Sequence, residues 1–298
     1  GIATQMVVEK QLALKGLNRK ELGREKFIKE IWKWKGQSGN EIISQLKKLG
    51  SSCDWSRERF TMDEGLSKSV IKVFVDLHKK KLIYKDLKLV NWDPALQTAV
   101  SDLEVIQKEI NGKLYYIKYA IKDSDQTVTI ATTRPETLFG DTALAVNPKD
   151  KRYKNIIGKT VIIPVANREI RIIEDIYADP EQGSGVVKIT PAHDFNDFLV
   201  GERNGLEKIN IFTKEAKLNN NAPADYEGLD RFEARDKLVE ELTQLNSIEK
   251  IDNIKHSIPF GDRSNSIIEP YLTEQWFLNA KKLSKEAIDK VKKKETSF

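Results

Sequence analysis

The sequence predicts a fold of the α/β class, in which helices and strands share one chain. Three features of the 298 residues support this prediction. Up to about residue 100, apolar residues recur at three- and four-residue spacing, as in helices with one buried stripe. From about residue 104, short runs rich in β-branched residues alternate with turns, which is typical of strands. Helical patterns return after the HDFND turn and from Phe232 to Leu245, so the second part is predicted to be mixed α/β.

Two amphipathic patterns and one helix start account for the helical first part. The apolar positions of the two patterns are Phe27, Ile28, Ile31 and Trp32, followed by Ile42, Ile43, Leu46 and Leu49. Thr61 and Glu64 have the spacing of a capping box, in which each side chain satisfies a backbone N–H at a helix start. The helix that they would open is expected to bury Val70, Val73, Phe74 and Leu77.

The second part is predicted to begin with a β-hairpin. The runs on either side of Asn111 and Gly112 are EVIQKEI and KLYYIKYAI, and Asn-Gly tolerates the positive φ angles of a tight primed turn. Further strand candidates are TVTIATT, TALAV, KTVIIPV, IRIIEDI and GVVKIT. We therefore expect three segments: a mainly helical stem segment at 1–104, a mixed α/β domain at 105–262 and a return segment at 263–298.

Composition and charge describe a globular protein. The hydrophobic share of 39% is too high for disorder by composition, and the length favours about two domains. No apolar run approaches the roughly 18 residues of a membrane span, and no signal segment opens the chain. We therefore expect a cytoplasmic protein without a membrane partner. The net charge of +5 indicates nucleic-acid binding only weakly, because 50 basic residues are nearly balanced by 45 acidic ones.

The segment PAHDFND carries two carboxylates that could act together. Asp194 and Asp197 lie three residues apart at the predicted start of a helix, so both can share one face. One interpretation is helix capping, with Asp194 as the N-cap and Asp197 compensating the helix dipole. Another is a metal site in which His193 joins the carboxylates, although such clusters are common by chance without a second histidine or cysteine. The pattern alone favours capping.

Polar residues at the ends of two predicted strands complete the candidate site. Lys188 and Thr190 alternate with apolar residues on the incoming strand and therefore point the same way. A surface position is an equally good interpretation of Lys188. Thr132, Thr133 and Arg134 lie where a strand ends before a proline, a place where N–H groups and hydroxyls can remain free to bind a ligand. Taken alone, this turn is as consistent with a structural role.

The two stretches together resemble the halves of a hydrolytic editing site. ATTRPETLFGDTALAV at 131–146 and GSGVVKITPAHDFND at 183–197 are similar to segments of the valyl, isoleucyl and leucyl aminoacyl-tRNA synthetases. In these class I enzymes, a β-rich, barrel-like editing domain is inserted in a Rossmann catalytic domain and cuts a mischarged amino acid from the tRNA 3′ end. The resemblance implies this α/β fold for residues 105–262 and a cleft shared by both stretches.

The resemblance also implies roles for individual residues. Asp197 would hold the α-ammonium group of the mischarged amino acid, while Asp194, with Lys188 and Thr190, would recognise its side chain and help to place water. The residues implied to act in catalysis are Asp197, Lys188 and Asp194. The residues implied to bind the 3′ adenosine, its ester and the amino acid are Thr132, Thr133, Arg134, Thr190 and His193.

A second site of this kind has a clear chemical purpose. A pocket shaped for valine cannot strongly exclude the nearly isosteric threonine, a limit that valyl enzymes themselves illustrate at about a hundredfold discrimination. A carboxylate such as Asp194 can accept a hydrogen bond from the hydroxyl of threonine, whereas valine would leave it unpaired at a cost of about 1–3 kcal/mol. Hydrolysis then requires a positioned water and oxyanion stabilisation, so we expect no metal and no cofactor for editing.

Longer stretches are most similar to the valyl-tRNA synthetases. They are GIATQ at the start, DWSRERFTMDEGLS at 54–67, LVNWDPALQTAVSDLEV at 89–105 and GDRSNSIIEPYLTEQWF at 261–277. The resemblance implies the 3′ end of tRNA(Val) as partner and threonine as the mischarged amino acid. For the full-length enzyme it implies ligation of valine with ATP and Mg, carried out by a monomer.

Two departures from the family pattern limit these expectations. Asp93, Ala95 and Leu96 stand where many relatives carry zinc-knuckle cysteines, and Cys53 is the single cysteine, so we expect no zinc. The sequence contains neither a His-Ile-Gly-His-like nor a Lys-Met-Ser-Lys-Ser-like segment for ATP binding. We expect a fragment that does not form aminoacyl-adenylate by itself. Gly1 and the lysine-rich end also suggest a chain cut from something longer.

Two alternatives remain open from the sequence. The first is a non-catalytic module that binds the tRNA acceptor end and depends on salt-sensitive contacts from basic residues. Its candidate residues are Lys281, Lys282, Lys285, Lys290 and Lys292. The second is a metal hydrolase centred on His193, which would be sensitive to chelators.

Overall fold

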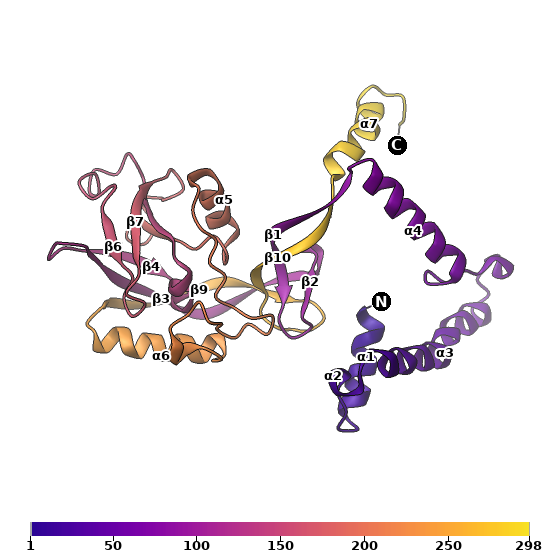
Figure 1. Cartoon of the computed structure of the whole chain (residues 1–298). Helices are drawn as coiled ribbons and strands as arrows, with labels where there is room; N and C mark the ends of the chain where they lie inside the picture. Colours follow the sequence, from indigo (N-terminus) through magenta and orange to yellow (C-terminus); the bar gives the residue numbers. More distant parts are fainter. Residues whose placement is uncertain (1, 298) are drawn as a thin grey trace. The chain divides into compact units, whose positions relative to one another are not determined.

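The structure is a computed structural model that describes residues 2–297. The chain forms two compact units, residues 1–81 and residues 82–298, which are described separately (Figure 1). None of the helices in residues 2–297 combines the length and the apolar character that crossing a membrane requires.

The first unit is helical, as its apolar spacing predicts. Its elements are α1 (Ile2–Ala13), α2 (Arg19–Leu22), α3 (Arg24–Lys48), the 3₁₀ turn η1 (Trp55–Arg57) and α4 (Glu64–Lys79). Phe27 of the first predicted stripe is buried with Val8 and Leu12 where α1 packs on α3. This core is small.

The start of α4 differs from the prediction. Asp63, and not Thr61, is the N-cap, and its carboxylate accepts the backbone N–H of Leu66 at 2.8 Å. Arg59 donates to the same carboxylate at 2.7 Å. Because a short acidic side chain next to the first helical residue reaches the free N–H groups directly, it displaces the more distant threonine.

The stripe predicted to be buried on α4 is not buried. Val70 is 63% exposed, Val73 is 55% exposed and Phe74 is 38% exposed. Helical spacing selects one face of a helix, but it cannot show what covers that face. This part of the prediction was wrong for the described residues.

The described residues of the second unit, 82–297, form two sheets and three α-helices. The small sheet has the order β10-β1-β2, built from β1 (Ile83–Asp93), β2 (Thr98–Val100) and β10 (Glu269–Leu278). The large sheet contains β3 (Val105–Ile121), β4 (Thr127–Thr132), β5 (Ala143–Val146), β6 (Thr160–Ile162), β7 (Glu169–Glu174), β8 (Val186–Ile189) and β9 (Ile248–Gly261). The helices are α5 (Phe195–Asn204), α6 (Arg231–Gln244) and α7 (Ala280–Lys292). Short 3₁₀ turns are η2 (Asp102–Glu104), η3 (Pro135–Gly140) and η4 (Ala224–Tyr226).

The large sheet curls on itself. Its strand order is β4-β3-β6-β7-β5-β8, and β9 pairs with β3 outside this path. The end strands β4 and β8 lie next to each other, so the sheet is nearly closed and barrel-like. Inside it, Ile117, Tyr119, Ile130 and Leu144 are fully buried. The mixed α/β, barrel-like fold that the resemblance implied is confirmed.

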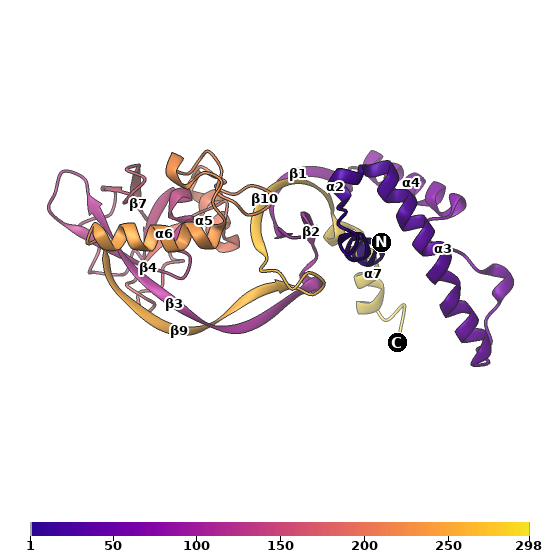
Figure 2. The ribbon, with the colours of Figure 1, turned by 90° about the horizontal axis from the view of Figure 1, so that it is seen from below.

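The predicted turn at Asn111 and Gly112 was wrong. Both residues lie inside the single long strand β3, opposite Lys255 and Ile254 of β9. Figure 2 shows β3 and β9 side by side as one long curved ribbon. The antiparallel ladder from Val105 onward outweighs the local turn preference of Asn-Gly. A Cβ on Gly112 would lie 2.4 Å from Nε2 of His256, so a larger residue here would displace the His256 ring.

The segment boundaries remain predictions. The structure divides at residues 81 and 82, because β1 and β2 join β10 in the second unit. These two strands lie within the 1–104 segment that was predicted to be mainly helical. β3 begins at Val105 and β9 ends at Gly261, so the predicted 105–262 segment contains the whole large sheet.

Candidate functional site

The ends of β4 and β8 open into one small cavity of about 300 Å³, which we name the inner pocket. β4 ends at Thr132 and continues into the TTRP turn, while β8 ends at Ile189 and continues into the HDFND turn. Since β4 and β8 lie next to each other, their two turns meet at one rim. All eight candidate residues line this pocket: Thr132, Thr133, Arg134, Lys188, Thr190, His193, Asp194 and Asp197.

Asp194 caps α5, as the structural interpretation of the pattern predicts. Its Oδ1 accepts the backbone N–H of Asn196 at 2.7 Å and that of Asp197 at 3.1 Å. Asp194 nevertheless lines the inner pocket and remains partly exposed. Capping occupies one carboxylate oxygen and leaves the side chain's charge at the pocket wall.

Asp197 is the most perturbed carboxylate of the pocket. It is 6% exposed, and its Oδ2 accepts the backbone N–H of Thr190 at 2.9 Å. Burial, followed by the nearby charge of Asp194, raises the pKa of Asp197 to about 7. The charge of Lys188 and the N–H of Thr190 oppose this shift. A carboxyl with this pKa changes its charge near neutral pH, and a cationic ligand beside it would stabilise the ionised form.

Lys188 is buried and not a surface residue. It is 8% exposed, and its Nζ donates to Oδ1 of Asp141 at 2.8 Å and to the hydroxyl of Thr190. Asp141 is fully buried at the back of the pocket and is a residue that the sequence prediction missed. The available signal was an aspartate in the stretch from Leu138 to Val146, in which Thr142 is the only other polar residue. A buried acid in such a stretch requires a buried partner.

His193 is a neutral side chain with a structural hydrogen bond. Its Nε2 accepts the backbone N–H of Ile211 at 2.9 Å, and its ring packs on Phe212. Burial, and then the charges of Arg134 and Lys188, hold the pKa of His193 well below its ordinary value. In residues 2–297, no group of three or more histidine, cysteine or acidic side chains could hold a metal ion. His193 therefore has no set of neighbouring ligands with which it could bind a metal ion in the described residues.

Arg134 connects the two turns to β10. It donates to the backbone oxygen of His193 at 2.9 Å and to the carboxylate of Glu269. The neighbouring Glu136 is fully buried and accepts two hydrogen bonds from Arg235 on α6, both at 2.7 Å. These charged pairs hold the TTRPET segment in place.

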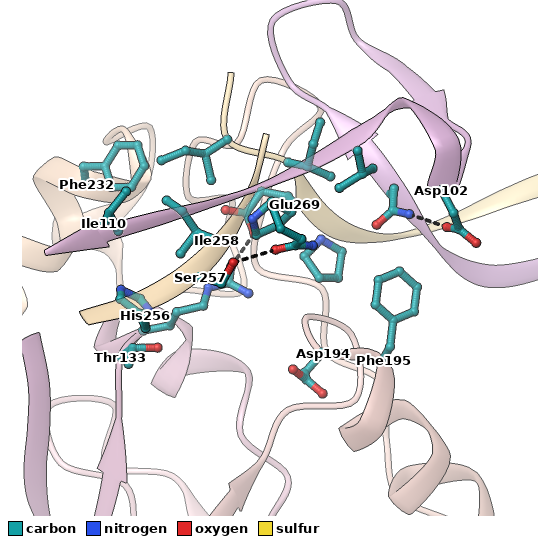
Figure 3. A pocket seen from close by; sticks show the side chains of 18 of the residues that line it. Asp102, Ile110, Thr133, Asp194, Phe195, Phe232, His256, Ser257, Ile258 and Glu269 are labelled. Carbon is teal, nitrogen blue, oxygen red and sulfur yellow. Dashed lines mark hydrogen bonds and ion pairs between the residues drawn. The ribbon is translucent and has the colours of Figure 1, made fainter. Parts of the chain in front are cut away.

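A second, larger cavity of about 670 Å³ adjoins the inner pocket, and we name it the outer cavity. Thr133, Arg134 and Asp194 line both spaces. Figure 3 shows Asp194 and Phe195 on one side of the outer cavity and Ser257 of β9 on the other. The site therefore has a small polar interior behind a wider entrance that could take a larger group.

The second unit thus combines a barrel-like α/β fold with an acidic, hydroxyl-lined pocket. The family model described as tRNA synthetases class I (I, L, M and V) matches residues 1–298. The chain belongs to this family.

Individual relatives agree with the family. The chain is 63% identical over its whole length to a protein of Pelagibacter ubique named Valine–tRNA ligase, and covers 34% of it. It is 54% identical to a protein of the same name from Bradyrhizobium diazoefficiens, again over its whole length and 34% of the relative. The chain thus spans about a third of the length of these relatives. A solved LeuRS in a ternary LeuRS–tRNA–LeuAMS complex from Agrobacterium radiobacter is similar with 19% identity and a TM-score of 0.38, over 80% of this chain and 37% of that one.

Proposed function

We propose that the inner pocket hydrolyses threonine from mischarged tRNA(Val), as the editing part of a valine–tRNA ligase. The observation that carries this proposal is the shared pocket, in which a buried lysine, hydroxyls and two carboxylates converge from two strand ends and the turns that follow them. The proposal takes tRNA(Val) as the substrate because the similar proteins are named valine–tRNA ligases. The family supplies the context of a tRNA synthetase.

The pocket can bind each part of a threonyl ester. The carboxylate of Asp197 holds the α-ammonium group, which favours the charged form of a carboxyl whose pKa is about 7 in the empty pocket. Lys188 and Thr190 contact the side-chain hydroxyl. Thr132, Thr133 and Arg134 hold the ester and the ribose of the 3′ adenosine. The outer cavity takes the adenosine base and the nucleotide before it.

Hydrolysis then requires water and charge stabilisation but no nucleophilic side chain. A water held between Asp194 and the ester carbonyl is positioned for attack, and positioning alone can lower a barrier by several kcal/mol. The hydroxyls of Thr132 and Thr133 are the donors that we assign to the developing oxyanion, because the backbone N–H of Arg134 is already bonded to Oγ1 of Thr132. His193 serves as a neutral acceptor that fixes the HDFND turn, because it is buried and bonded to Ile211.

Ligation of valine with ATP and Mg belongs to the full-length enzyme in this proposal. The inner pocket does not fit a triphosphate, because Asp194 and Asp197 stand in its wall and would repel it. We therefore derive no adenylation step from this region. The alternative, a module that holds the tRNA acceptor end without chemistry, would use the lysines of α7 and leave the pocket without a role.

Selectivity between two esters tests the proposed function. We expect the full-length enzyme to deacylate Thr-tRNA(Val) roughly 10- to 100-fold faster than Val-tRNA(Val), because valine leaves polar groups of the pocket unpaired at about 1–3 kcal/mol. Single-turnover deacylation of the two esters gives this ratio. Equal rates, or a rate for both esters no faster than hydrolysis in buffer, would rule out the proposed function.

A further inference from the structure

A buried polar cluster stands behind the inner pocket, and its centre is Asp141. This aspartate is fully buried and comes directly after η3. Its Oδ1 accepts hydrogen bonds from Nζ of Lys188 at 2.8 Å and from the hydroxyl of Thr190 at 2.6 Å. Its Oδ2 accepts the hydroxyl of Tyr119 at 2.7 Å. Three donors, from β3, β8 and the residue that follows β8, thus converge on one carboxylate.

The cluster determines with which carboxylate Lys188 forms an ion pair. Lys188 and Asp197 both line the inner pocket. In the described residues, Lys188 forms its ion pair with Asp141 and none with Asp197. Asp141 therefore draws the ammonium group to the back of the pocket. The carboxylate of Asp197 stays available for a cation.

The cluster also fixes the direction of each hydrogen bond. Because a carboxylate only accepts, Thr190 must use its one hydroxyl hydrogen on Asp141, and its oxygen can then only accept. Burial, and then the charge of Asp141, raise the pKa of Tyr119 well above its ordinary value, so its hydroxyl remains a donor. Lys188 directs two of its three N–H groups to Asp141 and Thr190. The third N–H and a lone pair of Thr190 remain for the pocket.

A ligand hydroxyl matches the two groups left free, which are one N–H of Lys188 and one lone pair of the Thr190 oxygen. It can accept from the remaining N–H of Lys188 and donate to the remaining lone pair of Thr190 at the same time. A methyl group in that place satisfies neither of them, and both polar groups would be desolvated without a partner.

We propose that Asp141 is a positioning residue, which makes the inner pocket selective for a side-chain hydroxyl by fixing the hydrogen-bond directions of Lys188 and Thr190. This inference rests on the proposed editing function. Asp141 does not touch the ester in this scheme. It acts through the two residues in front of it, with Tyr119 holding its other oxygen.

Asp141 also affects the charge state of Asp197. The titratable and charged groups that line the pocket with Asp197 or lie behind it are Asp194, Lys188, Arg134, Asp141, Tyr177 and the neutral His193. The charge of Asp141 raises the pKa of Asp197, and that of Lys188 lowers it. Neutralising Asp141 removes the first effect and frees Lys188 to approach Asp197. Both changes lower the pKa of Asp197.

The variant Asp141→Asn in the full-length enzyme tests the inference with two tRNA esters. The probes are Thr-tRNA(Val) and 2-aminobutyryl-tRNA(Val), whose side chain is smaller than that of threonine and has no hydroxyl. We expect kcat/KM for the threonyl ester to fall roughly 10- to 100-fold more than that for the aminobutyryl ester, which loses only what a contact of the freed Lys188 with Asp197 takes from the ammonium site. We also expect the acid limb of the kcat/KM profile to move down by roughly one pH unit.

Four further variants separate a positioning role from a structural one. Tyr119→Phe removes one hydrogen bond, and a loss of about two- to tenfold on the threonyl ester alone is expected. Lys188→Met combined with Asp141→Asn should lose less than the product of the two single losses, because Asp141 acts partly through Lys188. Asp150→Asn removes the charge of another buried aspartate, which is 8% exposed and paired with Arg152 away from the pocket. It should change neither the ratio of the two esters nor the pH profile.

Each outcome assigns the failure to one idea. If the wild-type enzyme does not hydrolyse Thr-tRNA(Val), the proposed function fails. If it does, and Asp141→Asn slows both esters equally with an unmoved acid limb, Asp141 is a structural residue and the inference is overturned. Should Asp141→Asn fail to fold, as circular dichroism would show, an unchanged ester ratio in Tyr119→Phe overturns it instead.

Discussion

Asp197→Asn is expected to lower deacylation of Thr-tRNA(Val) by the full-length enzyme roughly 10- to 100-fold. The reason is the loss of a charged hydrogen bond to the α-ammonium group, which contributes about 1.5–3 kcal/mol. The amide oxygen can still accept the N–H of Thr190, so the turn keeps its hydrogen bond. Single-turnover deacylation measures this loss. The control Asp150→Asn should retain the wild-type rate.

The same substitution is expected to stabilise the fold above neutral pH. The pKa of Asp197 is about 7 in the folded pocket, chiefly because of burial, and its reference value is 3.8. Between these values the unfolded chain releases a proton that the folded protein retains, so wild-type stability falls as pH rises from about 4 to 7. Asparagine avoids this loss. Its advantage should grow across that window and stay near 2–4 kcal/mol above it, by an order-of-magnitude estimate.

Urea unfolding at pH 4 and at pH 8 measures this advantage. Lower activity with higher stability at pH 8 is the expected combination. If the variant is less active and also less stable at pH 8, the account is contradicted. Asp197 would then stabilise the turn, and its burial would not lower the stability of the fold. Wild-type kcat/KM should rise with pH through about 7, as the carboxylate that binds the ammonium group forms.

Arg235→Met is expected to destabilise the second unit by about 3 kcal/mol at pH 7, because it leaves a buried carboxylate without its main partner. Glu136 is fully buried, and Arg235 holds it with two hydrogen bonds at 2.7 Å. Burial alone would raise the pKa of Glu136, but Arg235 and then Arg134 hold that pKa below its ordinary value. In the variant the pKa rises, and the deficit should shrink as pH falls and Glu136 takes up a proton.

Chemical unfolding across pH values measures this deficit. Replacing both partners, as Glu136→Gln with Arg235→Met, should recover a large part of it, since no buried charge then remains. Arg57→Met, at an exposed pair with Asp54, is the matched control and should change stability by less than about 0.5 kcal/mol. A pH-independent deficit in Arg235→Met would contradict the buried-charge explanation.

The sequence located the pocket because its signals are local. The TTRP and HDFND turns each follow a strand, and each carries polar side chains that a strand end leaves free. The N-cap role of Asp194 could likewise be predicted, since a short acidic residue before a helix acts within one turn. The prediction that the two turns meet depended on the resemblance, because four other strands separate β4 from β8 in the strand order.

Other parts of the site could not be predicted from the sequence. Asp141 matters because β3 brings Tyr119 and β8 brings Lys188 to its two oxygens, and no local pattern encodes that meeting. Asn111 has the local chemistry of a turn, yet tertiary pairing with β9 keeps it extended. Local propensity fails where long-range pairing supplies more hydrogen bonds than the turn would.

A structure of the full-length enzyme with a non-hydrolysable threonyl-adenosine analogue tests the central claim most directly. We expect the threonyl hydroxyl within hydrogen-bond distance of Nζ of Lys188 and Oγ1 of Thr190. The α-ammonium group should lie against Asp197, and the adenine in the outer cavity. An analogue bound elsewhere, or bound here with its side chain turned away from Lys188 and Thr190, would contradict the account.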